Sequence, residues 1–220
     1  MYTLKQNASY FALFFAFLCI GAYLIFTVPK GDVLITFNDQ YNWIWNQFFF
    51  YITILGSGIP TLLVCIGLLF YRFGHALLLF VSTGLSALTT QLCKCFLFEE
   101  VKRPKHYFDN EVFAQLDKVA GLYINAYHSF PSGHTTIVFA TCCALILLVS
   151  DKRWGYAFFI VALLTGLSRV YLLQHFFIDI YGGAIVGTFV TLMVFAILPS
   201  LKVWQNRNRP ARSLQGPKFR

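Results

Sequence analysis

The sequence predicts an all-α fold: a polytopic membrane helical bundle with six transmembrane helices and a small loop region on the outer face. Hydrophobic residues make up 58% of the 220 residues and charged residues only 12%, about half the charged fraction of a soluble domain. The apolar residues gather in stretches long enough to cross a bilayer, and the basic residues gather on one side of those stretches. This composition excludes a soluble globule, a disordered chain and a disulfide-rich secreted domain.

Six spans are expected between residues 10 and 198. A bilayer core of about 30 Å needs about 20 helical residues. The fifth and sixth spans share one apolar run, about twice as long as one bilayer crossing, so the chain should turn back near Leu172–His175. In the second span, Gly56-Ser-Gly-Ile-Pro60 predicts a kink. The predicted spans are Tyr10–Val28, Phe48–Tyr71, His75–Phe98, His134–Ser150 and the double run Trp154–Leu198.

The distribution of charge predicts the sidedness of the bundle. With a cytoplasmic N-terminus, ten basic residues and one acidic residue lie inside, while seven basic and eight acidic residues lie outside. This asymmetry follows the positive-inside rule, so both termini are expected in the cytoplasm of a multi-pass cell-membrane protein. The net charge of +8 therefore reflects topology, and no nucleic-acid partner is predicted. Residues 1–200 form the expected membrane domain, and residues 201–220 a basic tail lying on anionic membrane lipids.

The loop Glu99–Pro131 is the one long segment expected outside the membrane. In it, Asp109 can cap a short amphipathic helix whose Phe113 and Leu116 are expected to face the membrane. The six cysteines lie in or beside apolar stretches and lack the spacing of zinc ligands. No metal and no cofactor is predicted.

Polar side chains at membrane level are costly and are therefore candidates for function. They gather in three places, which the predicted topology brings to the outer ends of the third to sixth spans. These places are Lys94 with Arg103-Pro104, then Pro131-Ser132-Gly133-His134, then Ser168-Arg169 with His175 and Asp179.

Two of these places suggest acid–base and nucleophilic chemistry. His175 and Asp179 are spaced i, i+4, so one face of a helix is expected to carry both. A carboxylate there can hold one imidazole nitrogen as a donor and leave the other as a nucleophile. His134 offers a second imidazole for acid–base work. Because Gly133 lies at the start of a span, an anion can approach the free backbone N–H groups closely.

The remaining side chains suit a phosphate group. Arg103 and Arg169 offer planar guanidinium groups that match phosphate oxygens, and Lys94 adds a point charge. Taken singly, each feature has a structural explanation: a cap, a buried hydrogen bond or a side chain reaching the headgroups. Three cations, two histidines and an aspartate at one membrane face favour a catalytic site.

These residues resemble the type 2 phosphatidic acid phosphatase superfamily, whose membrane lipid phosphatases share a site design with vanadium haloperoxidases. The resemblance covers about Lys94 to Asp179. The family's first motif, Lys…Arg-Pro, departs here, because eight residues separate Lys94 and Arg103 where six are usual. The other two motifs are complete: Pro131-Ser132-Gly133-His134 and Ser168-Arg169-x5-His175-x3-Asp179.

The resemblance implies a mechanism. His175 would attack phosphorus and form a phosphohistidine, Asp179 would orient its ring, and His134 would protonate the leaving oxygen and then activate water. The groups implied to bind the phosphate are Lys94, Arg103, Arg169, Ser132 and the amide of Gly133.

The favoured function is therefore hydrolysis of a lipid phosphate or diphosphate at the outer face. Undecaprenyl diphosphate is the preferred substrate, with phosphatidylglycerophosphate, phosphatidic acid and a lipid A phosphate as alternatives. A phosphotransferase that passes the phosphoryl group to another lipid would use the same residues. A non-catalytic anion channel or transporter is the third hypothesis, although no span carries a polar stripe through the bilayer. The pattern indicates no oligomeric state.

The irregular first motif makes a specific structural prediction. Nine residues apart on one helix, Lys94 and Arg103 would point in opposite directions. The helix is therefore expected to stop near Phe98, and Val101–Arg103 to return as extended chain, as the proline at 104 favours. Because alternate side chains of an extended chain point oppositely, Lys102 should turn away from the site. Lys94 is thus preferred over Lys102 as the lysine of the motif.

The charge asymmetry predicts which parts of the chain are accessible from outside. In a cysteine-free background, Gln115→Cys should react with a membrane-impermeant maleimide added to intact cells, and Pro210→Cys should react only after permeabilisation. The reverse labelling pattern would contradict the orientation.

Overall fold

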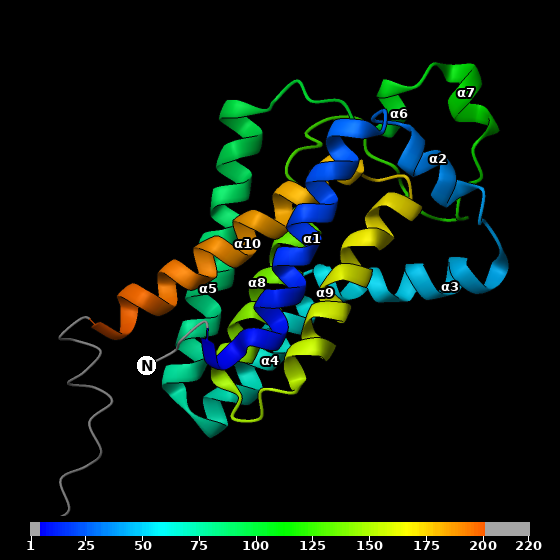
Figure 1. Cartoon of the computed structure of the whole chain (residues 1–220). Coiled ribbons are helices and arrows are strands. Elements are labelled where there is room, and N and C mark those ends of the chain that lie inside the picture. The colour runs from blue at the N-terminus through cyan, green and yellow to red at the C-terminus, as the bar shows by residue number, and fades with distance from the viewer. Residues whose placement is uncertain (1–4, 201–220) are drawn as a thin grey trace, which may run out of the picture.

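The structure, a computed structural model, describes residues 5–200, and every regular element in that range is helical (Figure 1). The predicted all-α class is therefore confirmed, whereas the predicted tail, 201–220, lies outside the described residues. The α-helices are α1 (Ala8–Thr27), α2 (Asp32–Asn38), α3 (Trp43–Ile52), α4 (Ile59–Tyr71), α5 (Phe73–Leu92), α6 (Pro104–Tyr107), α7 (Asn110–Gln115), α8 (Gly133–Leu148), α9 (Trp154–Tyr171) and α10 (Phe177–Ile197). Shorter helical turns are η1 (Lys5–Asn7), η2 (Thr53–Gly56), η3 (Cys93–Leu97) and η4 (Leu198–Ser200).

Four helices within the described residues are long and apolar enough to cross a membrane: α1, α5 continued by η3, α9, and α10 continued by η4. The bent pair of α3–η2 and α4 makes a fifth if it counts as one span. These five coincide with predicted spans. The other predicted span corresponds to α8, which has 16 residues. A helix that crosses a bilayer needs about 20. The count of six therefore stays a prediction.

The second span is broken where its glycines and proline predicted a kink. The two halves, Trp43–Gly56 and Ile59–Tyr71, are bent by 50°. Gly58, between them, has a φ of +89°, a conformation that only glycine adopts without strain, and Pro60 lies in the first turn of α4. The first half begins earlier than predicted, at Trp43, because the side chain of Asn42 caps it by accepting from the Trp45 N–H at 3.0 Å. Figure 1 shows α3 running across the direction of α5.

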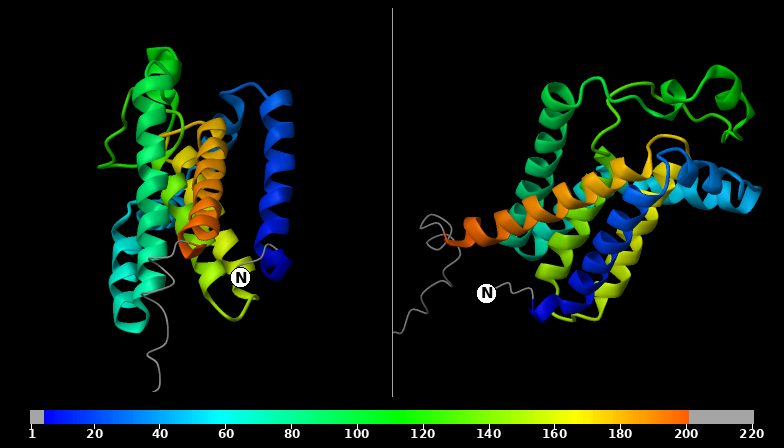
Figure 2. Two further views of the ribbon diagram at one scale, coloured as in Figure 1. Left: turned by 90° about the vertical axis from the view of Figure 1, so that its left-hand side faces the viewer. Right: turned by 45° about the horizontal axis from the view of Figure 1, so that its top comes forward.

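The segment between η3 and α8 packs on the bundle and does not simply extend into solvent. Figure 2 shows it running over the end of the bundle at which α9 ends and α10 begins. The predicted short helix is present as α7, directly after Asp109. Its expected orientation is wrong, because Phe113 and Leu116 pack against the buried cluster around Leu34 and Phe176. The two apolar side chains therefore pack against protein, where the amphipathic pattern had suggested contact with the membrane.

The central helix is α8, which packs against α5, α9 and α10 (Figure 1). Nearly every residue from Thr135 to Leu147 is buried. Two glycines let α10 approach it. A Cβ at Gly183 would lie 2.7 Å from the Ser132 carbonyl oxygen, and one at Gly187 would overlap the Thr136 carbonyl oxygen. This close approach holds the N-terminus of α8 against the first turns of α10.

The contact between α8 and α10 can be tested with a matched pair of glycine variants. Gly187→Ala should destabilise the fold by about 1–3 kcal/mol, because the added methyl must push two helix backbones apart. The control is Gly84→Ala in α5, where an added Cβ meets nothing within 4 Å. Thermal unfolding in detergent should show a lower Tm for the first variant only. Equal Tm values for both would contradict the close approach.

Candidate active site

The three predicted polar clusters come together at one end of the bundle. Lys94, in η3, lies within electrostatic range of Arg103, Arg169 and Asp179. His134, in the first turn of α8, lies within range of the same two arginines and of His175. Residues that are up to 85 positions apart in the chain, from Lys94 to Asp179, therefore share one site. Because three of them are cations, the site is electropositive.

His175 and Asp179 meet, but not on the face of one helix as expected. His175 lies in the turn between α9 and α10, where its N–H donates to the Arg169 carbonyl at 3.1 Å. Its Nδ1 is 3.4 Å from Asp179 Oδ2, and the two side chains are 3% and 0% exposed. Asp179 lies in the first turn of α10 and also accepts from the Phe176 N–H at 2.9 Å. The carboxylate of Asp179 thus caps the start of α10 and also contacts the ring of His175.

The environment of His175 favours its neutral form. Burial lowers the pKa of His175 below its ordinary value, and the nearby Arg103 and Arg169 add to this, against the opposing effect of Asp179. A neutral ring with Nδ1 turned to a carboxylate has its proton on Nδ1. Its Nε2 then keeps the lone pair that a nucleophile needs.

The chain returns to the site after η3 as predicted. The helix ends at Leu97, and Arg103 is extended, with φ −81° and ψ 168°. Two backbone hydrogen bonds fix the returning segment: Arg103 N–H to the Ala126 carbonyl and Ser129 N–H to the Val101 carbonyl, both 3.0 Å. Arg103 is 8% exposed, whereas Lys102 is exposed and lines an open polar pocket. The fold-back is confirmed, and the choice of Lys94 over Lys102 stays a prediction.

The guanidinium of Arg103 is held by carbonyl oxygens. Its Nε donates to the Tyr127 carbonyl at 2.8 Å, and one terminal nitrogen donates to Gln174 O and Oε1 at 3.3 Å each. Gln174 is itself fixed, because its Nε2 donates to the Tyr123 carbonyl at 2.9 Å. Burial lowers the pKa of Arg103 below its ordinary value, yet an arginine remains charged at neutral pH. Gln174 was not among the predicted site residues.

The break in the second span supports the other side of the site. Arg169 donates from one terminal nitrogen to Thr53 Oγ1 of η2 at 2.8 Å. Among the described residues, its buried Nε has no partner. Gly56, also in η2, packs so closely on His134 that a Cβ there would lie 2.8 Å from it. The sequence predicted the kink but not its contact with these two residues.

The first turn of α8 presents backbone to the site. Ser132 precedes the helix and is fully buried, and its Oγ accepts from Thr135 Oγ1 at 3.0 Å. The Ser132 N–H donates to the Asp179 carbonyl at 2.9 Å, which joins this turn to α10. A Cβ at Gly133 would meet nothing within 4 Å. An anion can therefore reach the backbone N–H groups at this helix start.

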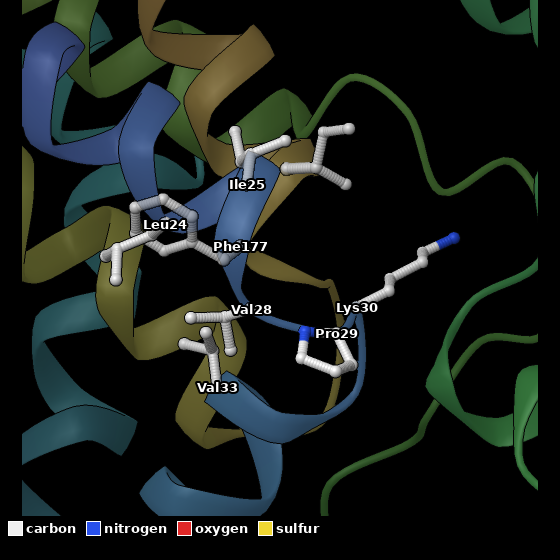
Figure 3. Close-up of a pocket in the computed structure, with 8 residues that line it drawn as sticks. Leu24, Ile25, Val28, Pro29, Lys30, Val33 and Phe177 are labelled. Atoms are coloured by element: carbon white, nitrogen blue, oxygen red, sulfur yellow. The ribbon is translucent and has the colours of Figure 1, made fainter.

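The structure also contains a separate apolar pocket (Figure 3). It is formed where α1 and α2 meet α10, with Leu24, Val33 and Phe177 among its walls. Figure 3 shows the Lys30 side chain extending away from these residues, and its Nζ lies 4.5 Å from the centre of the Phe176 ring. No predicted catalytic or phosphate-binding residue lines this pocket, so it is distinct from the candidate active site.

Comparison with known proteins yields consistent matches. The profile described as the PAP2 superfamily matches residues 75–211, more than half of the chain. The chain is 29% identical over 157 residues to a lipid A 1-phosphatase of Rhizobium etli, a match that covers 63% of this chain and 66% of that protein. It is 34% identical over 67 residues to the undecaprenyl-diphosphatase BcrC of Bacillus subtilis, which covers 30% and 34%. The chain thus spans between a third and two thirds of these relatives.

A solved structure has a similar fold. Aquifex aeolicus LpxE superposes with a TM-score of 0.66 at 22% identity, over 76% of this chain and 94% of that one. At this level of identity the match concerns the fold alone.

The positions of the two lysines predict different effects on catalysis. Lys94→Ala should lower kcat/KM for a lipid phosphate by at least about tenfold, or 1.4 kcal/mol, because it removes a cation from the electropositive site. Lys102→Ala should lower it clearly less, because that side chain is exposed. An equal loss, or a larger one at Lys102, in phosphate-release assays would contradict the assignment.

Proposed function

Because the chain belongs to the PAP2 superfamily, as its motifs predicted, we propose that it is an integral-membrane lipid phosphatase acting through a phosphohistidine intermediate. One observation carries the proposal: a buried histidine beside a buried carboxylate shares its site with a second histidine and three cations. A nucleophile, an acid–base group and a binding site for a phosphate dianion are the parts that phosphoryl transfer requires.

In the first proposed step, Nε2 of His175 attacks phosphorus, and the bond between phosphorus and the leaving oxygen breaks. His134 donates a proton to that oxygen. Asp179 keeps the ring oriented and stabilises the positive charge that the imidazole acquires. In the second step, His134 takes a proton from water, the water oxygen attacks phosphorus, and the bond to His175 breaks. Inorganic phosphate and free enzyme result.

The phosphate-binding groups stabilise both transition states. Charge on the transferring phosphoryl group spreads over three equatorial oxygens. Lys94, Arg103 and Arg169 surround that position with positive charge, and their burial strengthens each interaction. The Ser132 hydroxyl and the accessible Gly133 amide supply further donors. In this proposal the three cations do the work that a divalent metal ion does in other phosphoryl-transfer sites.

For the substrate we propose a lipid diphosphate or monophosphate, with undecaprenyl diphosphate preferred and phosphatidylglycerophosphate as an alternative. The activities for which the relatives are named support this class, because one is an undecaprenyl-diphosphatase and another a lipid A 1-phosphatase. Both activities remove phosphate from an amphiphile in a membrane. The apolar helices that surround the site would let such a substrate keep its tail in the bilayer.

The proposal includes six spans, with α8 as the fourth. A helix packed against α5, α9 and α10 needs less length than one exposed to lipid, because protein and not hydrocarbon surrounds it. The site would then face outward, with both termini inside and residues 201–220 as a cytoplasmic tail. The start of α1 and the turn between α8 and α9 lie at the end of the bundle opposite α6 and α7, which supports this arrangement (Figure 1).

The mechanism can be tested with purified protein and a panel of lipid phosphates that includes undecaprenyl diphosphate. Phosphate release should survive EDTA and be inhibited by vanadate, which resembles the transferring phosphoryl group. His175→Ala should abolish the formation of an acid-labile phosphoprotein. His134→Ala should slow turnover by about 10²–10⁴-fold. His75→Ala, at the other end of α5 from the site, is the matched control and should retain activity.

Three outcomes would contradict parts of this proposal. Activity that EDTA removes and Mg²⁺ restores would exclude the metal-independent mechanism. Transfer of labelled phosphate to a second lipid, without release into water, would indicate a phosphotransferase. No turnover of any lipid in the panel would count against the phosphatase itself.

A further inference from the structure

A buried serine outside the three motifs contacts the proposed nucleophile, His175, and its carboxylate partner, Asp179. Ser129 lies in the segment that leads into α8, and its side chain is fully buried. Its Oγ donates to Asp179 Oδ2 at 2.5 Å and lies 3.5 Å from His175 Nδ1. This hydroxyl therefore lies beside both the carboxylate and the imidazole, which also approach each other to 3.4 Å.

One oxygen of Asp179 receives all the donors in this group. Oδ2 accepts from Ser129 Oγ at 2.5 Å and from the Phe176 N–H at 2.9 Å, while His175 Nδ1 is 3.4 Å away. The contact with the imidazole is thus the longest of the three. The position of the carboxylate is set by the serine and the backbone amide, and the imidazole meets an acceptor that is already fixed.

The same serine also joins two parts of the site through its backbone. Its N–H donates to the Val101 carbonyl at 3.0 Å, two residues before Arg103. Arg103 in turn donates to the carbonyls of Tyr127 and His128, the residues just before Ser129. The segment that carries Ser129 thus holds the phosphate-binding arginine and the carboxylate in one arrangement.

We propose that Ser129 is a positioning residue for the reaction: it fixes the Asp179 carboxylate so that His175 keeps its proton on Nδ1 and directs the Nε2 lone pair at phosphorus. This inference rests on the proposed phosphatase function and deepens it. Ser129 donates to no atom of the substrate in this scheme. Its effect reaches the reacting atoms through Asp179 and His175.

The proposal predicts a loss in kcat with KM little changed. Ser129→Ala removes the hydroxyl but none of the phosphate-binding cations, so substrate binding should persist. A small misplacement of the nucleophile should lower kcat by about tenfold or more. Ser129→Cys, which nearly preserves the volume and replaces a strong donor with a weak one, should show a similar loss. The matched control is Ser82→Ala, a fully buried serine whose hydroxyl donates to the Leu78 carbonyl within α5.

The proposal also predicts a shift in the pH profile, which a purely structural role would not produce. Without the Ser129 hydroxyl, the negative charge of Asp179 loses one hydrogen-bond donor. This charge then stabilises the protonated, positively charged form of the imidazole more strongly. The pKa of His175 should then rise, and the acidic limb of kcat/KM should move to higher pH. The charged and titratable groups that act on His175 are present in all variants: Arg103, His134, Arg169 and Asp179, with Lys94 beside Asp179.

The measurements separate failure of this inference from failure of the phosphatase proposal. The assay uses phosphate release from dioctanoyl phosphatidic acid and undecaprenyl diphosphate, with Tm values as the check on folding. Nitrogen-15 chemical shifts of labelled histidine report the tautomer of His175 whether or not the protein is active. Wild-type kinetics and an unchanged tautomer signal in both folded variants would overturn the role of Ser129. An inactive wild type whose His175 signal nevertheless changes in the variants would count against the phosphatase function alone.

Discussion

The buried carboxylate of Asp179 is the group on which the arrangement of the site depends. It begins α10 by accepting the Phe176 N–H, accepts the Ser129 hydroxyl and lies beside the His175 ring. The carbonyl of the same residue accepts the Ser132 N–H at the start of α8. A charge buried without donors would cost several kcal/mol. The segment that leads into α8 and the turn before α10 therefore have to converge on this residue, and their convergence assembles this part of the site.

The helix packing makes that convergence possible. The glycines at 183 and 187 let α10 lie directly on α8, which brings the Pro-Ser-Gly-His turn to Asp179. On the opposite side, the break in the second span supplies Thr53 to Arg169 and backbone contact to His134. Breaks in a membrane helix are costly unless protein satisfies the freed groups. Here the irregular backbone occurs next to the polar side chains that need partners.

The positive charge of the site follows from the same geometry. Lys94, Arg103 and Arg169 repel one another and are partly or fully withdrawn from water. Carbonyl and hydroxyl oxygens stabilise the two arginines, but the buried Nε of Arg169 has no partner among the described residues. A bound phosphate would relieve both the repulsion and the missing hydrogen bond. Under the proposed function, the site is in this sense organised for an anion.

The sequence by itself determined the helical class, the positions of the long apolar helices, the turn before His175 and the polar residues that come together at one end of the bundle. Hydrophobic length, Gly-Pro breaks and motif spacing are local signals, and even the fold-back to Arg103 followed from helical geometry. Only the tertiary structure decided that Ser129, Gln174 and Thr53 support the site, and that Phe113 and Leu116 pack inward. These supporting residues lie 50, 71 and 116 positions from their partners. A single polar residue has no periodicity, so its partner becomes known only when the packed helices bring the two together.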